Sequence, residues 1–157
     1  MPLVFVYGTL MRAGANHAVL LRLGCRFVGL ATTREPRVLV DLGPYPALLP
    51  SGREESAVSC VSGEVWEIDD SALRELDAFE GSPELYTRER IRLLVDPEVD
   101  EGGELEAFVY VLARRPPAHA RVITSGRYAE AGTVLPDGAA PEQIEAAGDE
   151  QPRDDRD

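Results

Sequence analysis

The feature that most constrains the fold is a pair of alternating segments beyond the middle of the chain. Along Tyr86–Val95 arginines alternate with aliphatic side chains, and along Leu105–Leu112 small or β-branched side chains alternate with aromatic ones. A period of two is typical of a strand whose two faces differ. The connection, Asp96–Glu104, contains a proline and a pair of glycines, which favours a turn. These residues predict a β-hairpin.

Other segments add more strands than helices. Strands are predicted at Leu3–Tyr7, Arg26–Thr33, Arg37–Asp41 and Val58–Ile68, and helices at Asn16–Leu23 and Ala72–Glu80. A hairpin loop is predicted at Ser51–Ser56, a helical turn at Ala118–Ser125 and a final short element at Arg127–Val134. The three prolines of Gly43–Pro50 exclude a regular helix and predict a stiff, extended loop. Because successive strands lie at hairpin distances, we expect an α+β domain in which an antiparallel or mixed sheet packs against one or two helices.

Length and charge predict one folded domain and a tail. A chain of 157 residues is long enough for one domain with a hydrophobic core, which we place at residues 1–136. Residues 137–157 include 8 acidic and 2 basic side chains, so they carry half of the net charge of −12. Apolar residues are sparse there, which predicts a disordered acidic tail.

The same composition limits the partners. A net charge of −12 disfavours binding to nucleic acid or to an anionic membrane surface. No apolar run approaches the ~18 residues of a membrane span, and the N-terminus lacks the basic region and apolar run of a secretory signal. We therefore expect a cytoplasmic protein that acts on a small molecule. The sequence makes no prediction of the oligomeric state.

Cysteine and histidine are too few and too scattered for a metal site. Cys25 and Cys60 form no C-x-x-C pair, and His17 and His119 stand far apart in the sequence. In a cytosolic chain two such cysteines are expected to be reduced core residues. We expect no metal and no cofactor.

The segment Val4–Asn16 joins an apolar strand to a polar loop. The strand breaks at Gly8, and the residues that follow offer many backbone N–H donors. A rigid strand that ends in such a loop can hold an anion. An ordinary turn after a first strand has the same pattern, so the residues alone leave both interpretations open.

Glu80, at the end of the second predicted helix, is the least expected placement in the sequence. The apolar stripe of this helix is Leu73, Leu76 and Phe79, and helical spacing puts Glu80 on or beside it. Desolvation and the helix C-terminus both raise the pKa of such a carboxyl, which favours proton exchange near neutral pH. The alternative is a side chain that turns to solvent or pairs with an arginine of the next strand. Asp77 shares this face, as a second buried carboxylate or a capping partner.

Short motifs recur along the chain in a fixed order. They are Y-G-T-L at Tyr7–Leu10 continuing into M-R-x-G-x-N up to Asn16, G-P-Y-P-A-L at Gly43–Leu48, G-E-V-W at Gly63–Trp66, L-D-A-F-E-G at Leu76–Gly81, Y-T-R at Tyr86–Arg88, A-F-V-Y at Ala107–Tyr110 and S-G-R-Y at Ser125–Tyr128. This set resembles the γ-glutamylcyclotransferase-like family, also called AIG2-like. The form of Y-G-T-L together with L-D-x-F-E-G is more similar to its γ-glutamylamine branch than to its glutathione-specific branch.

The resemblance implies a fold and a reaction. The fold would be a small mixed β-barrel with a few flanking helices. The reaction would be attack by the α-amine of a γ-glutamyl group on its own γ-carbonyl, which closes 5-oxoproline and releases an amine or amino acid. Ring closure of this kind needs no separate nucleophile, metal or cofactor.

The resemblance also implies the site residues. Glu80 matches the catalytic glutamate of the family, which would act as both general base and general acid. The loop Tyr7, Gly8, Thr9 and Leu10 would bind the carboxylate and carbonyl groups of the substrate. Tyr110 and Tyr45 are candidates for shaping the pocket, although a tyrosine in a proline-rich loop can equally cover the edge of the core. Arg88 would orient Glu80 or pair on the sheet.

A second class of function stays open at this point. A small-molecule binding module could keep the same pocket without useful turnover. The group attached to the γ-glutamyl moiety is also open, because the motifs do not distinguish an amine from an amino acid.

Overall fold

The computed structural model describes residues 1–52 and 59–128. The tail at residues 137–157, most of the predicted loop Ser51–Ser56 and most of the predicted element Arg127–Val134 lie outside the described residues.

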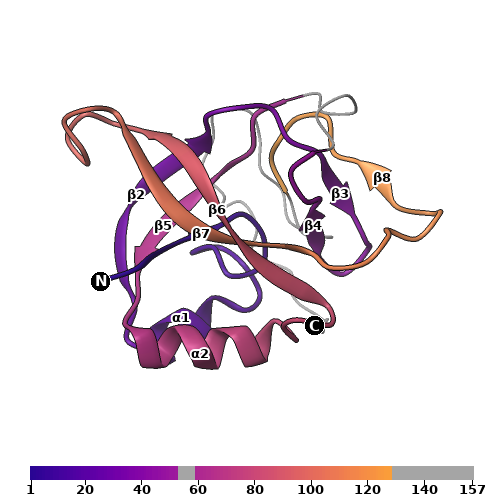
Figure 1. Cartoon of the computed structure of the whole chain (residues 1–157), viewed down its shortest axis with the longest axis horizontal. Helices are drawn as coiled ribbons and strands as arrows, with labels where there is room; N and C mark the ends of the chain where they lie inside the picture. Colours follow the sequence, from indigo (N-terminus) through magenta and orange to yellow (C-terminus); the bar gives the residue numbers. More distant parts are fainter. Residues whose placement is uncertain (53–58, 129–157) are drawn as a thin grey trace.

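The described residues form eight strands and two helices (Figure 1). The strands are β1 (Leu3–Val6), β2 (Arg26–Thr33), β3 (Leu39–Asp41), β4 (Pro46–Leu48), β5 (Ser62–Glu67), β6 (Tyr86–Val95), β7 (Glu104–Leu112) and β8 (Arg121–Val122), and the helices are α1 (His17–Arg22) and α2 (Asp70–Phe79). Asp69 caps α2, because its side chain accepts a hydrogen bond from the N–H of Ala72.

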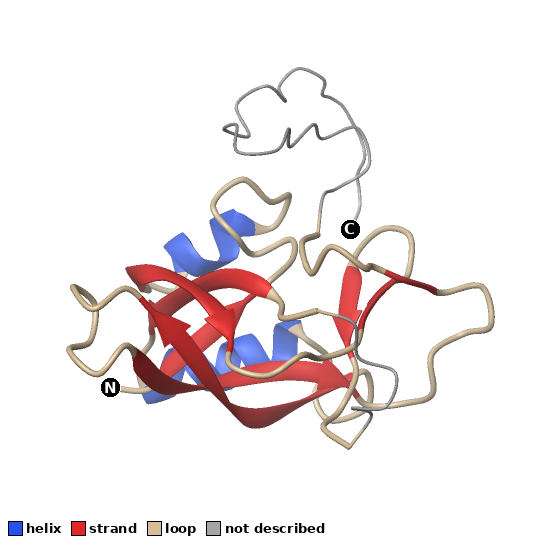
Figure 2. Cartoon of the chain, turned by 90° about the horizontal axis from the view of Figure 1, so that it is seen from above, coloured by secondary structure: helices blue, strands red, loops and turns tan. Residues whose placement is uncertain are grey.

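Five of the strands close into a barrel. They are hydrogen-bonded in the order β1-β5-β2-β6-β7, and β7 pairs back onto β1. All of these pairs are antiparallel except β1–β7, which is parallel. β4 adds to β7 in parallel, and β3 and β8 extend from β4. Figure 2 shows the strands crossing around the barrel with the helices outside it. The predicted mixed barrel with flanking helices is confirmed.

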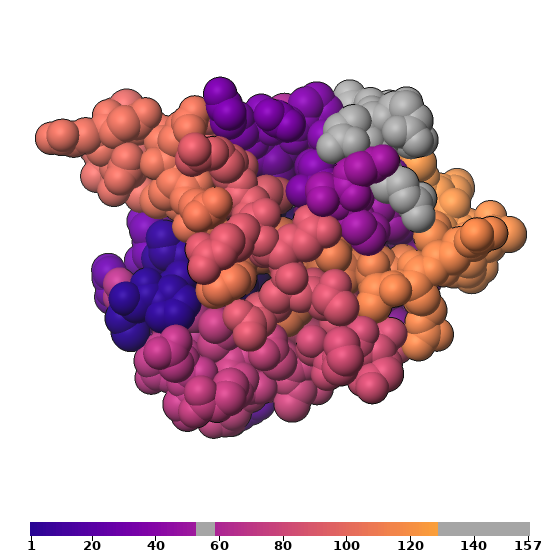
Figure 3. Space-filling view, viewed as in Figure 1, coloured from indigo at the N-terminus to yellow at the C-terminus, as the bar shows by residue number. Residues whose placement is uncertain are grey.

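The β6–β7 hairpin supplies the longest strand pair of the barrel. Its register runs from Tyr86 opposite Leu112 to Leu94 opposite Glu104. Ile91 is buried in the barrel and the arginines of β6 face outward, as the alternation predicted. The loop of this hairpin and the segment that follows β7 project from opposite ends of the molecule (Figure 3).

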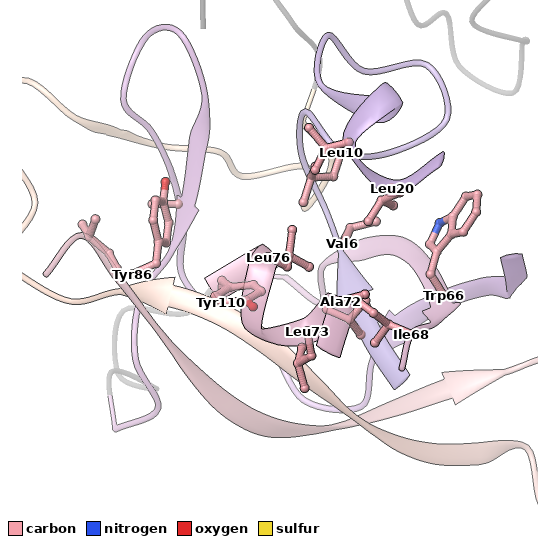
Figure 4. Packing of buried hydrophobic residues seen from close by; sticks show 14 of the residues in the cluster. Val6, Leu10, Leu20, Trp66, Ile68, Ala72, Leu73, Leu76, Tyr86 and Tyr110 are labelled. Carbon is pink, nitrogen blue, oxygen red and sulfur yellow. The ribbon is translucent and has the colours of Figure 1, made fainter. Parts of the chain in front are cut away.

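Buried side chains form two clusters that share the barrel wall. One fills the barrel and is made of residues such as Phe5, Val65 and Val109. The other lies between the outside of the wall and the helices, where Leu76 of α2 is fully buried, as is Leu20 of α1 (Figure 4). Because β1 is covered on both faces, its sequence is apolar rather than alternating.

Three local predictions differ from the structure. Gly43–Pro50 is extended as predicted, but its centre is strand β4 rather than loop, because Leu48 pairs with Val111 of β7. Ala118–Ser125 is not a helical turn: it contains β8, which pairs with β3. Phe79 is not on the buried stripe of α2, since 46% of it is exposed.

The two cysteines follow the prediction in part. Cys25 and Cys60 are free thiols, as predicted, but both are half-buried rather than core residues. Burial raises the pKa of Cys25 to about 11.

Neither helix of the described residues is long and apolar enough to cross a membrane.

Gly63 tests how tightly β1 packs against β5. A Cβ at this position would clash with the carbonyl oxygen of Val6, which is backbone and cannot move alone. We expect Gly63→Ala to lower the free energy of unfolding by about 1–3 kcal/mol, as overpacking does elsewhere. Gly102→Ala is the control, because the nearest atom to its added Cβ lies 3.4 Å away. Denaturant unfolding of both variants gives the answer, and equal stabilities would contradict the tight pairing.

Candidate active site

A cavity of about 190 Å³ opens where the end of β1, the end of α2 and the starts of β4 and β6 meet. It is walled mainly by apolar and aromatic side chains, with one charged residue. The lining residues are Phe5, Val6, Tyr7, Gly8, Thr9, Leu10, Asn16, Tyr45, Pro46, Phe79, Glu80, Leu85, Tyr86 and Tyr110.

The loop after β1 is held by its carbonyl groups. The N–H of Met11 donates to the carbonyl oxygen of Gly8 at 3.1 Å, and the N–H of Asn16 donates to that of Thr9 at 2.8 Å. The Asn16 side-chain amide donates to the Thr9 hydroxyl at 3.0 Å, and His17 Nδ1 lies 3.0 Å from the carbonyl oxygen of Leu10. The loop therefore packs back onto the start of α1.

The N–H groups of the same loop are left available. Among the hydrogen bonds of the described residues, none uses the N–H of Gly8, Thr9 or Leu10 as a donor. All three residues line the cavity. Consecutive backbone donors without partners attract an anion or a polarised carbonyl oxygen.

Gly8 also sets how closely the loop approaches β4. A Cβ on Gly8 would lie 2.7 Å from Cγ of Pro46, which is another lining residue. A residue without a side chain is required for this contact.

Glu80 ends α2 and faces the cavity. Its N–H donates to the carbonyl oxygen of Leu76 at 2.9 Å, so it caps the last turn. Gly81 then takes a φ of +69°, which ends the helix and returns the chain toward Leu85. This turn places both Glu80 and Leu85 on the cavity wall.

The electrostatic setting of Glu80 raises its pKa. Burial of the carboxyl group raises this pKa from 4.5 to about 7. Of the ion pairs found in the described residues, none involves Glu80. At neutral pH such a carboxyl is divided between its two protonation states, which is the property required of a group that both takes and gives a proton.

Arg88 does not pair with Glu80. Its Nε lies 2.8 Å from Oδ1 of Asp77, and a second guanidinium nitrogen lies 3.1 Å from Oδ2. Arg88 can therefore orient Glu80 only through the helix. The pair joins the last turns of α2 to β6. Asp77 is thus an ion-pair partner of Arg88, whereas the sequence left open a second buried carboxylate or a capping partner.

The buried tyrosines of the cavity use their hydroxyl groups to hold the wall together. Tyr7 donates to the carbonyl oxygen of Tyr110 at 2.8 Å and accepts from the N–H of Leu48 at 3.0 Å. Tyr110 donates to Oδ1 of Asp77 at 2.6 Å, and Tyr86 donates to the carbonyl oxygen of Pro46 at 3.2 Å.

These tyrosines are poor candidates for proton exchange. Burial raises the pKa of Tyr7, Tyr86 and Tyr110 above the ordinary value, and the hydrogen bond to Asp77 raises that of Tyr110 further. They stay protonated at neutral pH. Glu80 is left as the lining residue best suited to exchange a proton with a ligand.

The structure brings together all seven residues that the sequence proposed for the site. Tyr7, Gly8, Thr9, Leu10, Tyr45, Glu80 and Tyr110 all line this cavity. Sequence reasoning missed Asn16, Phe79, Leu85 and Tyr86 as lining residues. Tyr86 had a usable signal, because it begins the Y-T-R motif, whereas no local pattern marks Leu85.

In the described part of the chain, a small mixed barrel carries a cavity whose one charged lining residue is a carboxylate. This combination is typical of an enzyme that uses acid–base chemistry on a small molecule. Within the described residues, no group of three or more His, Cys, Asp or Glu is placed to hold a metal ion. The arrangement can bind a small polar ligand and move a proton within it.

Comparison with known proteins identifies the family. Residues 4–130 match the gamma-glutamyl cyclotransferase, AIG2-like family. The chain belongs to this family, and it is an enzyme of the gamma-glutamyl cyclotransferase type. It is 41% identical over 138 residues to the human gamma-glutamylaminecyclotransferase, covering 78% of this chain and 86% of the human one. It is 31% identical over 128 residues to a putative gamma-glutamylcyclotransferase of Methanocaldococcus jannaschii, covering 82% and 96%.

A solved structure agrees with this assignment. The crystal structure of an AIG2-like protein from Mus musculus superposes with a TM-score of 0.69 at 31% identity, covering 99% of each chain. The barrel with its additional strands is therefore the fold of this family.

The raised pKa of Glu80 has a consequence for stability. Between pH 4.5 and about 7 the folded state binds a proton at Glu80 that the unfolded state has lost, so the contribution of Glu80 to stability falls as the pH rises through this range. Glu80→Gln cannot titrate. We therefore expect the stability of wild type relative to Glu80→Gln to decline from pH 4.5 to about 7 and then to level off. Denaturant unfolding of both proteins across this range measures the difference, and parallel curves would contradict the raised pKa.

Proposed function

We propose that this enzyme is a cofactor-independent γ-glutamyl cyclotransferase that acts on γ-glutamylamines, with Glu80 as general base and general acid. The observation that carries the proposal is a desolvated carboxyl, with a pKa of about 7, on the same cavity as three N–H groups that have no hydrogen-bond acceptor among the described residues. The products are 5-oxoproline and the free amine.

The loop after β1 would receive the polar groups of the γ-glutamyl moiety. Its N–H groups at Gly8, Thr9 and Leu10 suit a carboxylate or a carbonyl oxygen, because each supplies a donor without a competing acceptor. When the γ-carbonyl becomes tetrahedral, a donor already in place stabilises the developing oxyanion without reorganisation.

Glu80 would manage the protons. Its carboxylate takes a proton from the α-ammonium group, and the resulting amine attacks the γ-carbonyl carbon to form the ring C–N bond. The protonated carboxyl then delivers a proton to the leaving nitrogen as the original amide C–N bond breaks. Overall two protons move from the attacking nitrogen to the leaving amine, which departs as an ammonium ion, and Glu80 ends as it began.

The charge of the cavity supports an amine, rather than an amino acid, as the leaving group. Of the described residues that line it, Glu80 alone is charged, and none is an arginine or a histidine. A leaving amino acid would bring a carboxylate close to Glu80 without a cation to balance it. Tyr45, Phe79 and Leu85 line the cavity and are all exposed by more than a third, so the apolar stem of an amine would meet an apolar rim. The name of the human relative, gamma-glutamylaminecyclotransferase, points the same way.

The test is release of 5-oxoproline from a matched pair of substrates. One is the γ-glutamyl derivative of a straight-chain alkylamine. The other is the γ-glutamyl derivative of the α-amino acid that has the same carbon chain and one carboxylate added on the carbon next to nitrogen. We expect the amine derivative to have the higher kcat/KM, and amidation of the amino acid to restore most of the difference. Glutathione and ε-(γ-glutamyl)lysine complete the panel.

Glu80→Gln tests the role of the carboxyl in the same assay. We expect a fall in kcat of ~10²–10⁴-fold, the usual contribution of general acid–base catalysis. Glu84→Gln is the control, because Glu84 is exposed and does not line the cavity. Turnover by Glu80→Gln equal to wild type would refute the mechanism. Absence of turnover across the panel, with ligand still raising the Tm, would favour the binding module instead.

A further inference from the structure

Glu64 is a buried carboxylate that the proposed reaction does not use. It lies on β5 opposite Val6 of β1, and only 6% of it is exposed. Its Oε1 accepts from the main-chain N–H of Arg12 at 3.0 Å and from Nε1 of Trp66 at 3.1 Å, and its Oε2 accepts from Nε of Arg12 at 3.1 Å. A buried carboxylate is stable only with partners of this kind.

The main-chain bond matters more than the ion pair. The Arg12 side chain is 50% exposed, and its guanidinium also lies over the ring of Phe27 at 3.9 Å. An ion pair with a half-exposed partner contributes little. The N–H of Arg12 is different, because it belongs to the loop itself, two residues after Leu10.

This bond ties the loop to the barrel. The contacts from Asn16 and His17 are local, since they join the loop to the helix that follows it. Glu64 is 52 residues from Arg12 in the sequence and stands on a barrel strand. It therefore adds a polar tie between the loop and a barrel strand to the packing of Leu10 in the outer cluster.

We propose that Glu64 is a positioning residue, which holds the Gly8–Leu10 donors at the distance that the substrate requires. The expected rise in KM rests on the proposed function, whereas the expected loss of order in the loop does not. Without the carboxylate, the N–H of Arg12 loses its acceptor, and the loop loses its polar tie to β5. The donors then meet the substrate in many geometries rather than one, and affinity falls.

Kinetics of three variants test the proposal with the γ-glutamylamine substrate. We expect Glu64→Ala to raise KM by about tenfold or more, because uniform binding is lost. Glu64→Gln, which keeps an acceptor for the Arg12 N–H, should recover most of this affinity. Arg12→Ala removes the side chain but keeps the main-chain bond, so its KM should stay within about twofold of wild type.

Trp66→Phe separates positioning from general stability. It removes a hydrogen bond from the same carboxylate and alters the same core, but leaves Arg12 in place. If Glu64 acted only on stability, Glu64→Ala and Trp66→Phe would both lower the Tm and the active fraction, which lowers apparent kcat without raising KM. A raised KM in Glu64→Ala but not in Trp66→Phe supports positioning. Equal KM values in the two variants overturn it.

A second readout keeps the inference separate from the proposed function. Backbone ¹⁵N relaxation reports the order of the Gly8 and Thr9 amides in each variant without any substrate. If wild type releases no 5-oxoproline from the panel, the proposed function fails, and positioning is then judged on these amides alone. Lower order parameters in Glu64→Ala than in Trp66→Phe support it, and unchanged order overturns it.

Discussion

The parallel pairing of β1 with β7 is the constraint on which the site depends. It closes the barrel by placing Val4 opposite Phe108 and Phe5 opposite Val109. Because β1 then ends beside β7, the hydroxyl of Tyr7 reaches the carbonyl oxygen of Tyr110 at 2.8 Å. The same hydroxyl accepts from the N–H of Leu48 and so fixes β4 as well. One buried tyrosine thus joins three walls of the cavity.

The distribution of charge around the cavity is the second requirement. Among the described residues, three arginines pair with carboxylates other than Glu80: Arg88 with Asp77, Arg12 with Glu64 and Arg37 with Glu89. A cation beside Glu80 would favour the ionised form and lower its pKa. Because these arginines are paired elsewhere, none of them offsets the rise in the pKa of Glu80 that desolvation causes. The proposed acid–base role follows from this isolation rather than from an activating partner.

The sequence predicted the parts of the structure that follow from local pattern. The β6–β7 hairpin was evident because its alternation extends over ten residues of β6 and is bounded by a turn. Glu80 was found because a charge beside an apolar helical stripe breaks the expected pattern. β4 was not found as a strand, because its partners are short β3 and the distant β7, and prolines flank it. Long-range pairing of this kind leaves no periodic signal in the segment itself.

Side-chain roles that depend on tertiary contacts were also out of reach. Spacing placed Phe79 in the buried stripe, but α2 ends there and the side chain turns to the cavity rim. Glu64 read as an ordinary residue of an alternating strand, because its partner Arg12 lies in a loop 52 residues earlier. The family motifs predicted residues that line the cavity, whereas the hydrogen bonds that hold its wall join segments far apart in the sequence.

Titration of the Glu80 carboxyl by NMR is the most direct test of its proposed acid–base role. With ¹³C-labelled glutamate, the Glu80 resonance is assigned as the one that disappears in Glu80→Gln. We expect this resonance to titrate with a pKa of about 7, and kcat/KM for a γ-glutamylamine to rise with pH over the same range. A Glu80 resonance that titrates near the ordinary value of 4.5 would contradict the central claim, because the carboxyl would then be a permanent anion unable to return a proton at neutral pH.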